Sequence, residues 1–597
     1  MRARGTVRAA LLFCVSGMAS AGAPPSAAMP ELPVTVADWA HGARLFEGLG
    51  SFHRGVMTSS PLAQQYFDQG MRWLWAFNHD EATRSFAKAA ELDPACAACY
   101  WGVALTVGPN YNLPTMAEPR ARVAAEALQR AQQNAAHASA VEQGLIAALA
   151  TRYPTTQTRE PASLEAAGLE SVSRAYAAAM RELAQRFPQD LDVQTLSAEA
   201  AMNVHAWKLW TADGQPAEGT PDIEARLESV LAREPSHPGA NHYYIHVMEA
   251  SPHPEKALAA AERLGGMMPA AGHLEHMPAH ILQRVGRYEE AAEANRRGVG
   301  ADRVYFAAVS PPDYYAMYLA HNYAFLAYSA AMEGRKAETL SAVQEVVQTV
   351  PLSMELAMGG SGWGLTQQYA ALVRFGLWDE LIALAPPAPS SPGLSAGYLY
   401  GRGVALAARG RLEEARTALA ELRSLSAGVP EKQHLLHDVL AVAEPIVAAR
   451  IAASEGQDAE AITSLEAAVA AEDRLPYNEP SDWFFPARHL LGAQLLIARR
   501  PAEAERVYRA DLKRNPRNGW ALYGLAAALR AQGKTGEAMR VTREFGVAWQ
   551  HADVRLVASA FWFAGPDTFS CECQRTASGD RQTGGELLGP QHEARVD

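Results

Sequence analysis

The stretch Tyr66-Phe67-Asp68-Gln69-Gly70-Met71-Arg72-Trp73, with Ala82, Phe86, Ala89 and Pro94 after it, decides the fold of this 597-residue chain. Its apolar and small residues recur at helical spacing, and signals for strands are nearly absent from the chain. Short turns that contain Gly or Pro interrupt the helical pattern. The stretch therefore predicts two antiparallel helices within about 34 residues.

The second half of this pattern returns along the chain, at 286–291, 410–415, 456–461, 504–516 and 533–538. Its order Ala-x3-Phe…Pro is the tetratricopeptide signature, in which small residues let paired helices approach and large ones fill the seam to the next repeat. A helical bundle could mimic one or two matches, but not matches spread from residue 62 to 545. We expect an all-α fold, a tetratricopeptide-like right-handed solenoid of helix-turn-helix repeats.

The first residues are typical of an export signal. Arg2, Arg4 and Arg8 precede an apolar stretch, and Ala-Ser-Ala follows at 19–21. No later segment offers the roughly 20 uninterrupted apolar residues that a membrane span needs. We expect a signal peptide at 1–21, a periplasmic or secreted protein, and no integral membrane segment after signal removal.

Five segments follow from these patterns. After the signal peptide we expect a flexible N-terminal segment at 22–50, an N-terminal repeat array with a His-rich concave site at 51–348, a C-terminal repeat array at 349–565, and a disordered tail at 566–597. The stretch 386–397, rich in Pro, is predicted to be a loop, and it could divide the repeats into two superhelical blocks.

Charge and cysteine content limit the function classes. The formal net charge of −12 argues against nucleic-acid binding, which needs a basic face to replace counterions. Once Cys14 leaves with the signal, Cys96, Cys99, Cys571 and Cys573 remain. An oxidising compartment favours disulfides, either local or between the two pairs, and metal binding by the second pair is an alternative.

The spacing of the histidines points to a site. His242 and His246 are four residues apart, as are His276 and His280, so each pair shares one helix face. Each residue of the first pair lies 34 residues, one repeat, before its counterpart in the second. Packed helices lie about 8–10 Å apart, so the four imidazoles could converge on one ion. His273, Glu249 and His321 could contribute further ligands, and the donor set suits zinc, copper or iron.

Other interpretations of these histidines stay open. They could line a polar groove for a protein or peptide partner, or they could serve only as hydrogen-bonding groups. Pro278 predicts that the helix holding His280 begins there, which would leave His273 and His276 in the preceding turn with a different aim. Phosphate-loop, Gly-x-Ser-x-Gly and His-Glu-x-x-His motifs are missing, so an enzyme would have to be metal-assisted, with Glu249 or Glu275 as a base.

Three segments carry a resemblance, namely Asn-His-Tyr-Tyr-Ile-His at 241–246, His-Met-Pro-Ala-His-Ile at 276–281 and Tyr-Asn-Glu-Pro-Ser-Asp-Trp-Phe-Phe-Pro-Ala-Arg-His-Leu-Leu-Gly at 477–492. In their order they resemble a group of exported bacterial tetratricopeptide-repeat proteins, over most of the mature chain. The resemblance implies a ligand-binding concave face and no settled activity. Members often have His-Asn-x-His where this chain has His321-Asn322-Tyr323-Ala324, which implies one ligand fewer here.

Three functions remain at this point. The favoured hypothesis is a periplasmic binding module whose His-lined concave site holds a transition metal or a polar ligand. A metal-dependent enzyme of hydrolytic or oxidative type, built on the same site, is the first alternative. A protein–protein interaction scaffold with incidental histidines is the second.

Overall fold

The structure is a computed structural model, which describes residues 32–153, 166–309, 315–357 and 361–561. The predicted signal peptide, the predicted tail at 566–597, and Cys571 and Cys573 lie outside these ranges. One unit of the chain begins at Pro33 and contains all the elements below. Within the described ranges β structure is limited to single bridge residues, such as the pair Trp210 and Pro216, and no strand is present, so the fold is all-α as predicted.

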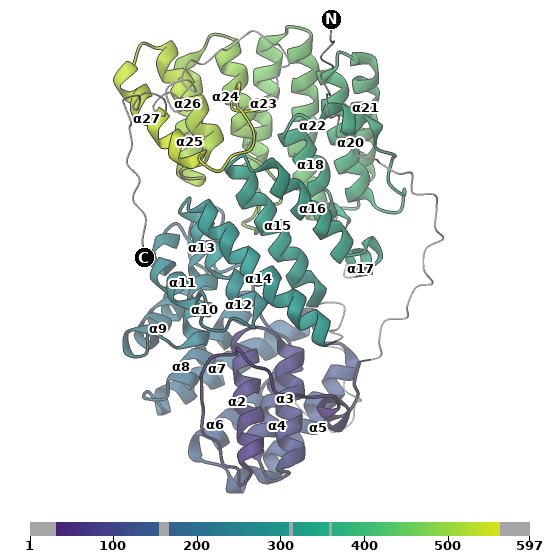
Figure 1. Cartoon of the computed structure of the whole chain (residues 1–597). Helices are drawn as coiled ribbons and strands as arrows, with labels where there is room; N and C mark the ends of the chain where they lie inside the picture. Colours follow the sequence, from purple (N-terminus) through teal and green to yellow (C-terminus); the bar gives the residue numbers. More distant parts are fainter. Residues whose placement is uncertain (1–31, 154–165, 310–314, 358–360, 562–597) are drawn as a thin grey trace, which may run out of the picture. The chain divides into compact units, whose positions relative to one another are not determined.

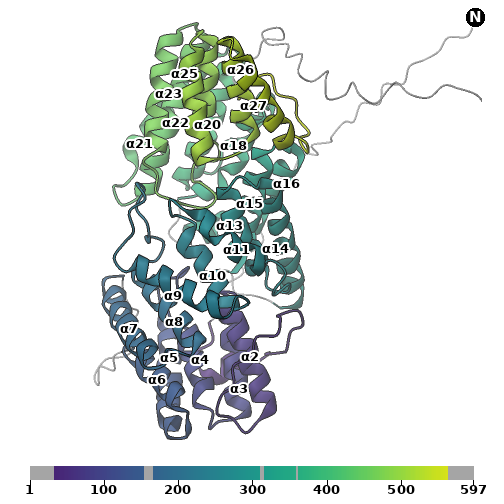
Figure 2. The same ribbon diagram turned by 90° about the vertical axis from the view of Figure 1, so that its left-hand side faces the viewer.

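Twenty-seven α-helices are described, most of them packed against the next helix along the chain (Figures 1 and 2). The first thirteen are α1 Val36–Ala40, α2 Pro61–Trp75, α3 His79–Leu92, α4 Ala97–Thr106, α5 Glu118–Asn134, α6 Ala140–Ala150, α7 Ala166–Arg186, α8 Leu191–Met202, α9 Thr220–Arg233, α10 Pro238–Met248, α11 Leu258–Leu264, α12 Gly272–His276 and α13 Pro278–Arg284. The remaining ones are α14 Tyr288–Ala308, α15 Ala316–Met332, α16 Lys336–Thr349, α17 Leu352–Ala357, α18 Gln367–Arg374, α19 Trp378–Ala383, α20 Pro392–Ala408, α21 Leu412–Gly428, α22 His434–Ser454, α23 Asp458–Glu472, α24 Ala487–Ile497, α25 Pro501–Arg514, α26 Gly519–Ala531 and α27 Thr535–Ala548.

Turns of three residues join successive helices, and their central residues have positive φ. These are Phe77, Gly286, Gly334, Gly376, Gly410, Gly456, Arg499 and Gly533. Glycine adopts this left-handed conformation without steric cost, whereas a residue with a Cβ is strained by about 1–2 kcal/mol. The glycine that begins most of the repeated sequence motifs therefore lies at the centre of the turn that reverses the direction of the chain. Phe77 is strained in the same position, next to the site described below.

Large aromatic rings of the second helices fit between glycines of the flanking helices. Phe86 of α3 lies against Gly70 of α2 and Gly102 of α4, and a Cβ at either glycine would overlap the ring. Tyr508 of α25 occupies the same kind of slot between Gly492 and Gly524. Both rings are fully buried, which explains the recurring Ala-x3-aromatic pattern of the sequence.

Replacing Gly102 with alanine should test this packing. We expect a loss of about 1–3 kcal/mol in the free energy of unfolding, because the new methyl group forces Phe86 out of its slot. Gly300→Ala is the matched control, since a Cβ there meets nothing within 4 Å and α14 should gain about 0.5–1 kcal/mol from it. Urea unfolding measures the free energy of unfolding of both variants, and equal values would contradict the proposed packing of Phe86 between the two glycines.

Two segments differ from the sequence expectations. The segment 22–50 was expected to be flexible, but within it α1 begins after the capping residue Thr35, and Trp39 is only 1% exposed. The predicted loop at 386–397 ends early, because Ser391 caps α20 and Pro392 begins it. Proline at the first helical position has no amide hydrogen to lose, so it starts this helix instead of prolonging the loop.

The hydrophobic core consists mainly of two extended clusters, one with members from Val36 to Tyr318 and the other from Tyr288 to Ala560. They share α14 and α15, so these helices join the two parts of the core. Near the start of the first cluster, Cys96 and Cys99 form a buried local disulfide at the beginning of α4. Of the pairings left open for Cys96 and Cys99, the structure has the local disulfide.

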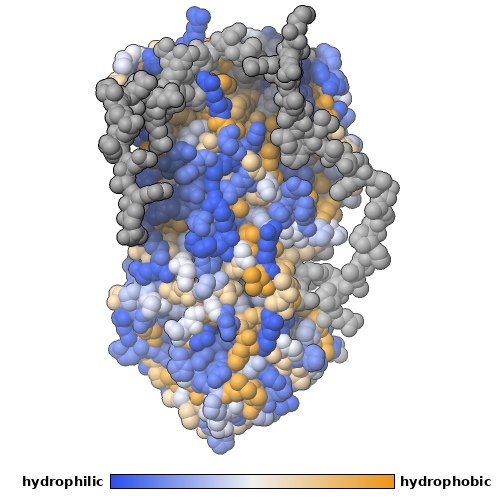
Figure 3. Space-filling model, viewed as in Figure 1, coloured by the Kyte–Doolittle hydropathy of each residue, from blue (hydrophilic) through white to orange (hydrophobic). Residues whose placement is uncertain are grey.

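On the face shown in Figure 3, hydrophilic residues alternate with smaller hydrophobic areas. Among the described helices, none combines the length and the apolar character that crossing a membrane requires.

Candidate metal centre

Four neighbouring helices supply six histidines to one buried region (Figure 1). His242 and His246 come from α10, every residue of which is buried. His273 and His276 come from the short helix α12, His280 from α13 and His321 from α15. Helix α13 begins at Pro278, as the sequence predicts. His273 and His276 precede this break, but they are helical and their rings still face the other histidines.

The first three histidines form a compact group, hereafter triad A. Its members are His242, His246 and His273, whose ligand atoms lie within 4.8 Å of one another. The Nε2 atom of His242 is 3.1 Å from Nε2 of His246 and 3.2 Å from Nε2 of His273. Two nitrogens bound to one ion at 2.0–2.1 Å lie about 2.9–3.4 Å apart when the angle at the ion is between 90° and the tetrahedral value. The two distances from His242 fall within this range.

The other three histidines form triad B. His276, His280 and His321 again bring one nitrogen each within 4.8 Å of the others. Nε2 of His276 lies 2.6 Å from Nε2 of His280, and the ring of His321 is 4.8 Å from that of His276. The two triads are in contact, because the rings of His246 and His280 are 5.8 Å apart. The site is therefore a pair of adjacent three-histidine groups.

Hydrogen bonds at Nδ1 determine which nitrogen of each ring is free. Nδ1 of His242 donates to the backbone oxygen of Trp75 at 2.6 Å, one of the carbonyls left free where α2 ends. Nδ1 of His276 donates to Oδ1 of Asn295 at 2.6 Å. Each of these rings, when neutral, then carries its lone pair on Nε2. A metal-binding histidine is held by such an outer hydrogen bond in nearly all known sites.

Two buried carboxylates complete the outer layer. Oε1 of Glu249 accepts from Nδ1 of His246 in triad A at 3.1 Å, and its Oε2 lies 2.8 Å from Nδ1 of His280 in triad B. Glu479, from the loop between α23 and α24, contacts the same Nδ1 of His280. Glu249 therefore touches both triads, whereas Glu479 touches triad B. Both carboxylates also group with His280 as a third set of possible ligands.

The arrangement leaves lone pairs facing one another. In triad A, Nδ1 donates in both His242 and His246, so no proton remains for the 3.1 Å contact between their Nε2 atoms. In triad B, Nδ1 of His276 donates, whereas Nδ1 of His280 lies 2.8 Å from Oε2 of Glu249 without forming a hydrogen bond, so Nε2 of His280 can donate across the 2.6 Å contact. Facing lone pairs repel unless a cation lies between them, which is the role that a metal ion plays among imidazoles.

Protonation of one ring could relieve this repulsion, but burial disfavours the charged form of the imidazole. It lowers the pKa of His246 to about 3 and that of His321 to about 4, with the positive charge of His246 adding to the effect at His321. Burial also depresses the pKa of His242, His273, His276 and His280, and neighbouring histidines depress each further. Burial raises the pKa of both Glu249 and Glu479 well above the ordinary value. A bound cation would favour the neutral imidazoles and the ionised carboxylates together.

Three sequence expectations need correction. The four histidines of the two pairs do not converge on one ion, because each pair joins a different third histidine, His273 or His321. Glu275 is not available as a base, since its carboxylate accepts from the amide of Gly266 and pairs with Arg297 at 2.8 Å. The histidines do not line an open groove either: those of α10, α12 and α13 are at most 3% exposed, so a peptide on the surface would not reach them.

Aromatic rings close the site. The ring of Phe77, in the strained turn after α2, stacks on His246 and His273 at 5.5 and 5.7 Å. Tyr111 and Tyr318 contact triad A from two further segments. Phe325 packs on all three rings of triad B. These rings exclude water, which strengthens every electrostatic interaction inside.

Glu479 and Phe77 also belong to the site, although the sequence alone did not predict them there. Glu479 belongs to a segment that carried the family resemblance, so an acidic residue in that segment was the signal available. Phe77 had a weaker signal, a bulky residue at a turn position that glycine occupies in most other repeats. Neither residue could be assigned to the histidines without the packing that brings them there.

Glu249→Gln and Glu479→Gln should weaken metal binding in different patterns. Loss of an outer carboxylate typically costs 10- to 100-fold in metal affinity. Because Glu249 contacts both triads, we expect both ions to bind that much more weakly, whereas Glu479→Gln should affect only the ion of triad B. Competition titration with a chromophoric chelator measures each step. Identical two-step titration curves for the two variants would contradict these assignments.

Comparisons with known proteins add little to this site. No family model matches the chain, and no curated protein sequence does. Among solved structures, the human IFIT1 dimer with m7Gppp-AAAA is similar at 11% identity and a TM-score of 0.32, over 76% of this chain and 90% of that one. The Cut9-Hcn1 hetero-tetramer of APC/C is similar at 10% identity and a TM-score of 0.27, over 70% and 80%. The likeness is too distant to indicate what this chain binds.

Proposed function

We propose that this chain is an exported helical-repeat protein that binds two transition-metal ions, one in each histidine triad. The observation that carries the proposal is the 3.1 Å contact in triad A between Nε2 atoms whose rings already donate through Nδ1, next to a second group of three histidines. Each of the two adjacent triads could hold one cation. Six imidazoles suit copper, zinc or iron, whereas calcium and magnesium prefer oxygen ligands.

The burial of the site supports a metal centre over a simple polar network. A polar network of this size inside a protein is stable only when its members are satisfied. Here Nδ1 of His273 and both carboxylate oxygens of Glu479 form no hydrogen bond with other described residues. Bound cations would compensate the carboxylate charge and order the rings.

The same geometry supports metal-assisted chemistry at triad B. Three protein ligands leave an open coordination position, where a bound ion can activate water or bind oxygen. His321 is the most accessible of the six histidines, and with Glu479 it also lines a pocket. We therefore favour a metal-dependent enzyme over a storage site, with triad A closed beneath Phe77 and triad B facing the pocket.

The experiment that tests the proposal is metal analysis of the mature protein, secreted to a periplasm and purified without a nickel column. We expect about two transition-metal ions per chain after equilibration with Cu²⁺ or Zn²⁺. A content near zero that does not rise on titration would contradict the proposal. The same preparation reports export, because N-terminal sequencing of the periplasmic protein should begin after residue 21.

A protein partner for the repeats stays a prediction. The helix-turn-helix scaffold is of a kind that suits protein binding. Pull-down from periplasmic extract, with metal-free protein as the control, separates such a partner from the metal centre.

A further inference from the structure

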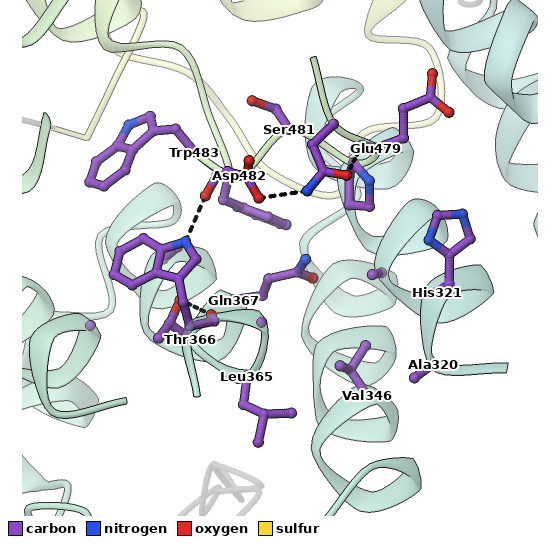
Figure 4. Close-up of a pocket in the computed structure, with 18 of the residues that line it drawn as sticks. Ala320, His321, Val346, Leu365, Thr366, Gln367, Glu479, Ser481, Asp482 and Trp483 are labelled. Atoms are coloured by element: carbon purple, nitrogen blue, oxygen red, sulfur yellow. Dashed lines mark hydrogen bonds between the residues drawn. The ribbon is translucent and has the colours of Figure 1, made fainter. Parts of the chain in front are cut away.

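A pocket of about 290 Å³ lies next to triad B, enclosed by α15, α16, α18, α20 and the loop before α24. His321 and Glu479 lie toward one side of it and Trp483 toward the other (Figure 4). Its volume is near the lower end of the range for small-molecule sites. Because both groups at the first side belong to the candidate metal centre, a molecule in the pocket would reach the ion of triad B.

Several polar atoms in the pocket wall are buried and form no hydrogen bond with other described residues. They are Oε1 of Gln367, the hydroxyl of Tyr400 and Nε1 of Trp483. Buried polar groups in folded proteins are hydrogen-bonded in the great majority of cases. Donors and acceptors gathered around one cavity therefore indicate a polar ligand or the water that it replaces.

The charge of the wall indicates which ligand. The pocket is lined by three acidic residues, Glu355, Glu479 and Asp482, and by no Lys or Arg among the described residues. Burial raises the pKa of Asp482 to about 6 and raises that of Glu355, so both carboxylates would gain from a nearby cation. The indole rings of Trp363 and Trp483, stacked on each other at 6.1 Å, also line the pocket, and indole rings attract cations.

We infer that this pocket is the substrate chamber of the metal centre and takes a small organic amine with an aromatic or alkyl body. The ammonium group lies near Glu355 and Asp482, the body packs on Trp363 and Trp483, and the far polar end faces His321. The metal ion next to the pocket depends on the proposed function, whereas the selectivity for cations depends only on the residues of the pocket wall. In the chain without metal, a carboxylate of the same shape is repelled by the acidic wall.

Two probes that share a phenol ring test the charge selectivity. Tyramine carries an ammonium group, and 4-hydroxyphenylacetate carries a carboxylate on a chain of similar length. Isothermal titration of the metal-free full chain should give tyramine an affinity at least about tenfold higher, which corresponds to 1.4 kcal/mol. Equal affinities, or tighter binding of the carboxylate, would overturn the inference.

Variants locate the binding. Glu355→Gln retains the acceptor for the amide of Gly362 but removes a charge, so tyramine affinity should fall about three- to tenfold. Glu380→Gln, an exposed residue of α19 outside the pocket, is the control and should leave the affinity unchanged. Ala370→Phe fills the pocket and should abolish binding without changing metal content. Binding that survives both pocket variants places tyramine elsewhere and overturns the inference.

Cobalt substitution separates this inference from the proposed function. The absorption spectrum of Co²⁺ bound to the chain reports its coordination, and tyramine should shift that spectrum in the wild type but not in Ala370→Phe. Two bound cobalt ions with no tyramine binding would remove the substrate chamber and leave the metal centre standing. Tyramine binding with the predicted selectivity, but no cobalt uptake, would remove the metal centre and reduce the pocket to an amine site.

Discussion

Replacing His276 and His280 together with alanine should lower the metal content of the chain from about two ions to about one. Both residues belong to triad B, and a single remaining histidine, His321, cannot hold an ion against a chelator. Triad A keeps its three imidazoles and its Nδ1 bond to Trp75, so its ion should remain. Elemental analysis after dialysis against a weak chelator measures the change.

The reciprocal variant makes this test specific. His242→Ala with His246→Ala should remove the ion of triad A and keep that of triad B, and the four-alanine variant should bind none. His253→Ala is the control, because that side chain is 62% exposed in the turn after α10. Far-UV circular dichroism should stay near that of the wild type, since the flanking helices keep their apolar contacts. Full metal content in either double variant would disprove the two-triad assignment.

Removing both ions should lower the free energy of unfolding by several kcal/mol. An ion that binds only the folded chain stabilises it by about 4 kcal/mol when free metal is 1,000-fold above the dissociation constant. The effect should be large here because the ligands tie the end of α2, the helices from α10 to α15 and the loop of Glu479 together. Urea unfolding with saturating metal, compared with excess chelator, measures the difference.

The triad variants again provide the control for stability. The His276 and His280 double variant, with one ion, should lose about half of the metal-dependent difference. The four-alanine variant should unfold at the same urea concentration with and without chelator, which rules out an effect of the chelator itself. If the wild type loses both ions and its unfolding midpoint stays constant, the ions are not part of the folded structure in the way we propose.

Local sequence patterns were sufficient to predict the all-α fold. Helical period, turn glycines and the Ala-x3-aromatic pattern each depend on residues close in the chain, and the structure has the expected helix pairs. The i, i+4 histidine pairs were visible for the same reason. The repeat period could not predict which third histidine joins each pair. It suggested that two equivalent pairs would face one ion, whereas the break at Pro278 and the approach of α15 produce two groups.

The sequence by itself determined that this protein would be a helical repeat with a cluster of histidines one repeat apart, because those features arise within one helix or between adjacent helices. Only the tertiary structure decided that the cluster is buried and divided into two triads. It also joined them through Glu249, supplied Glu479 from a distant loop and placed a pocket beside His321. The physical reason is that these contacts depend on how distant repeats pack, which no local spacing in the chain specifies.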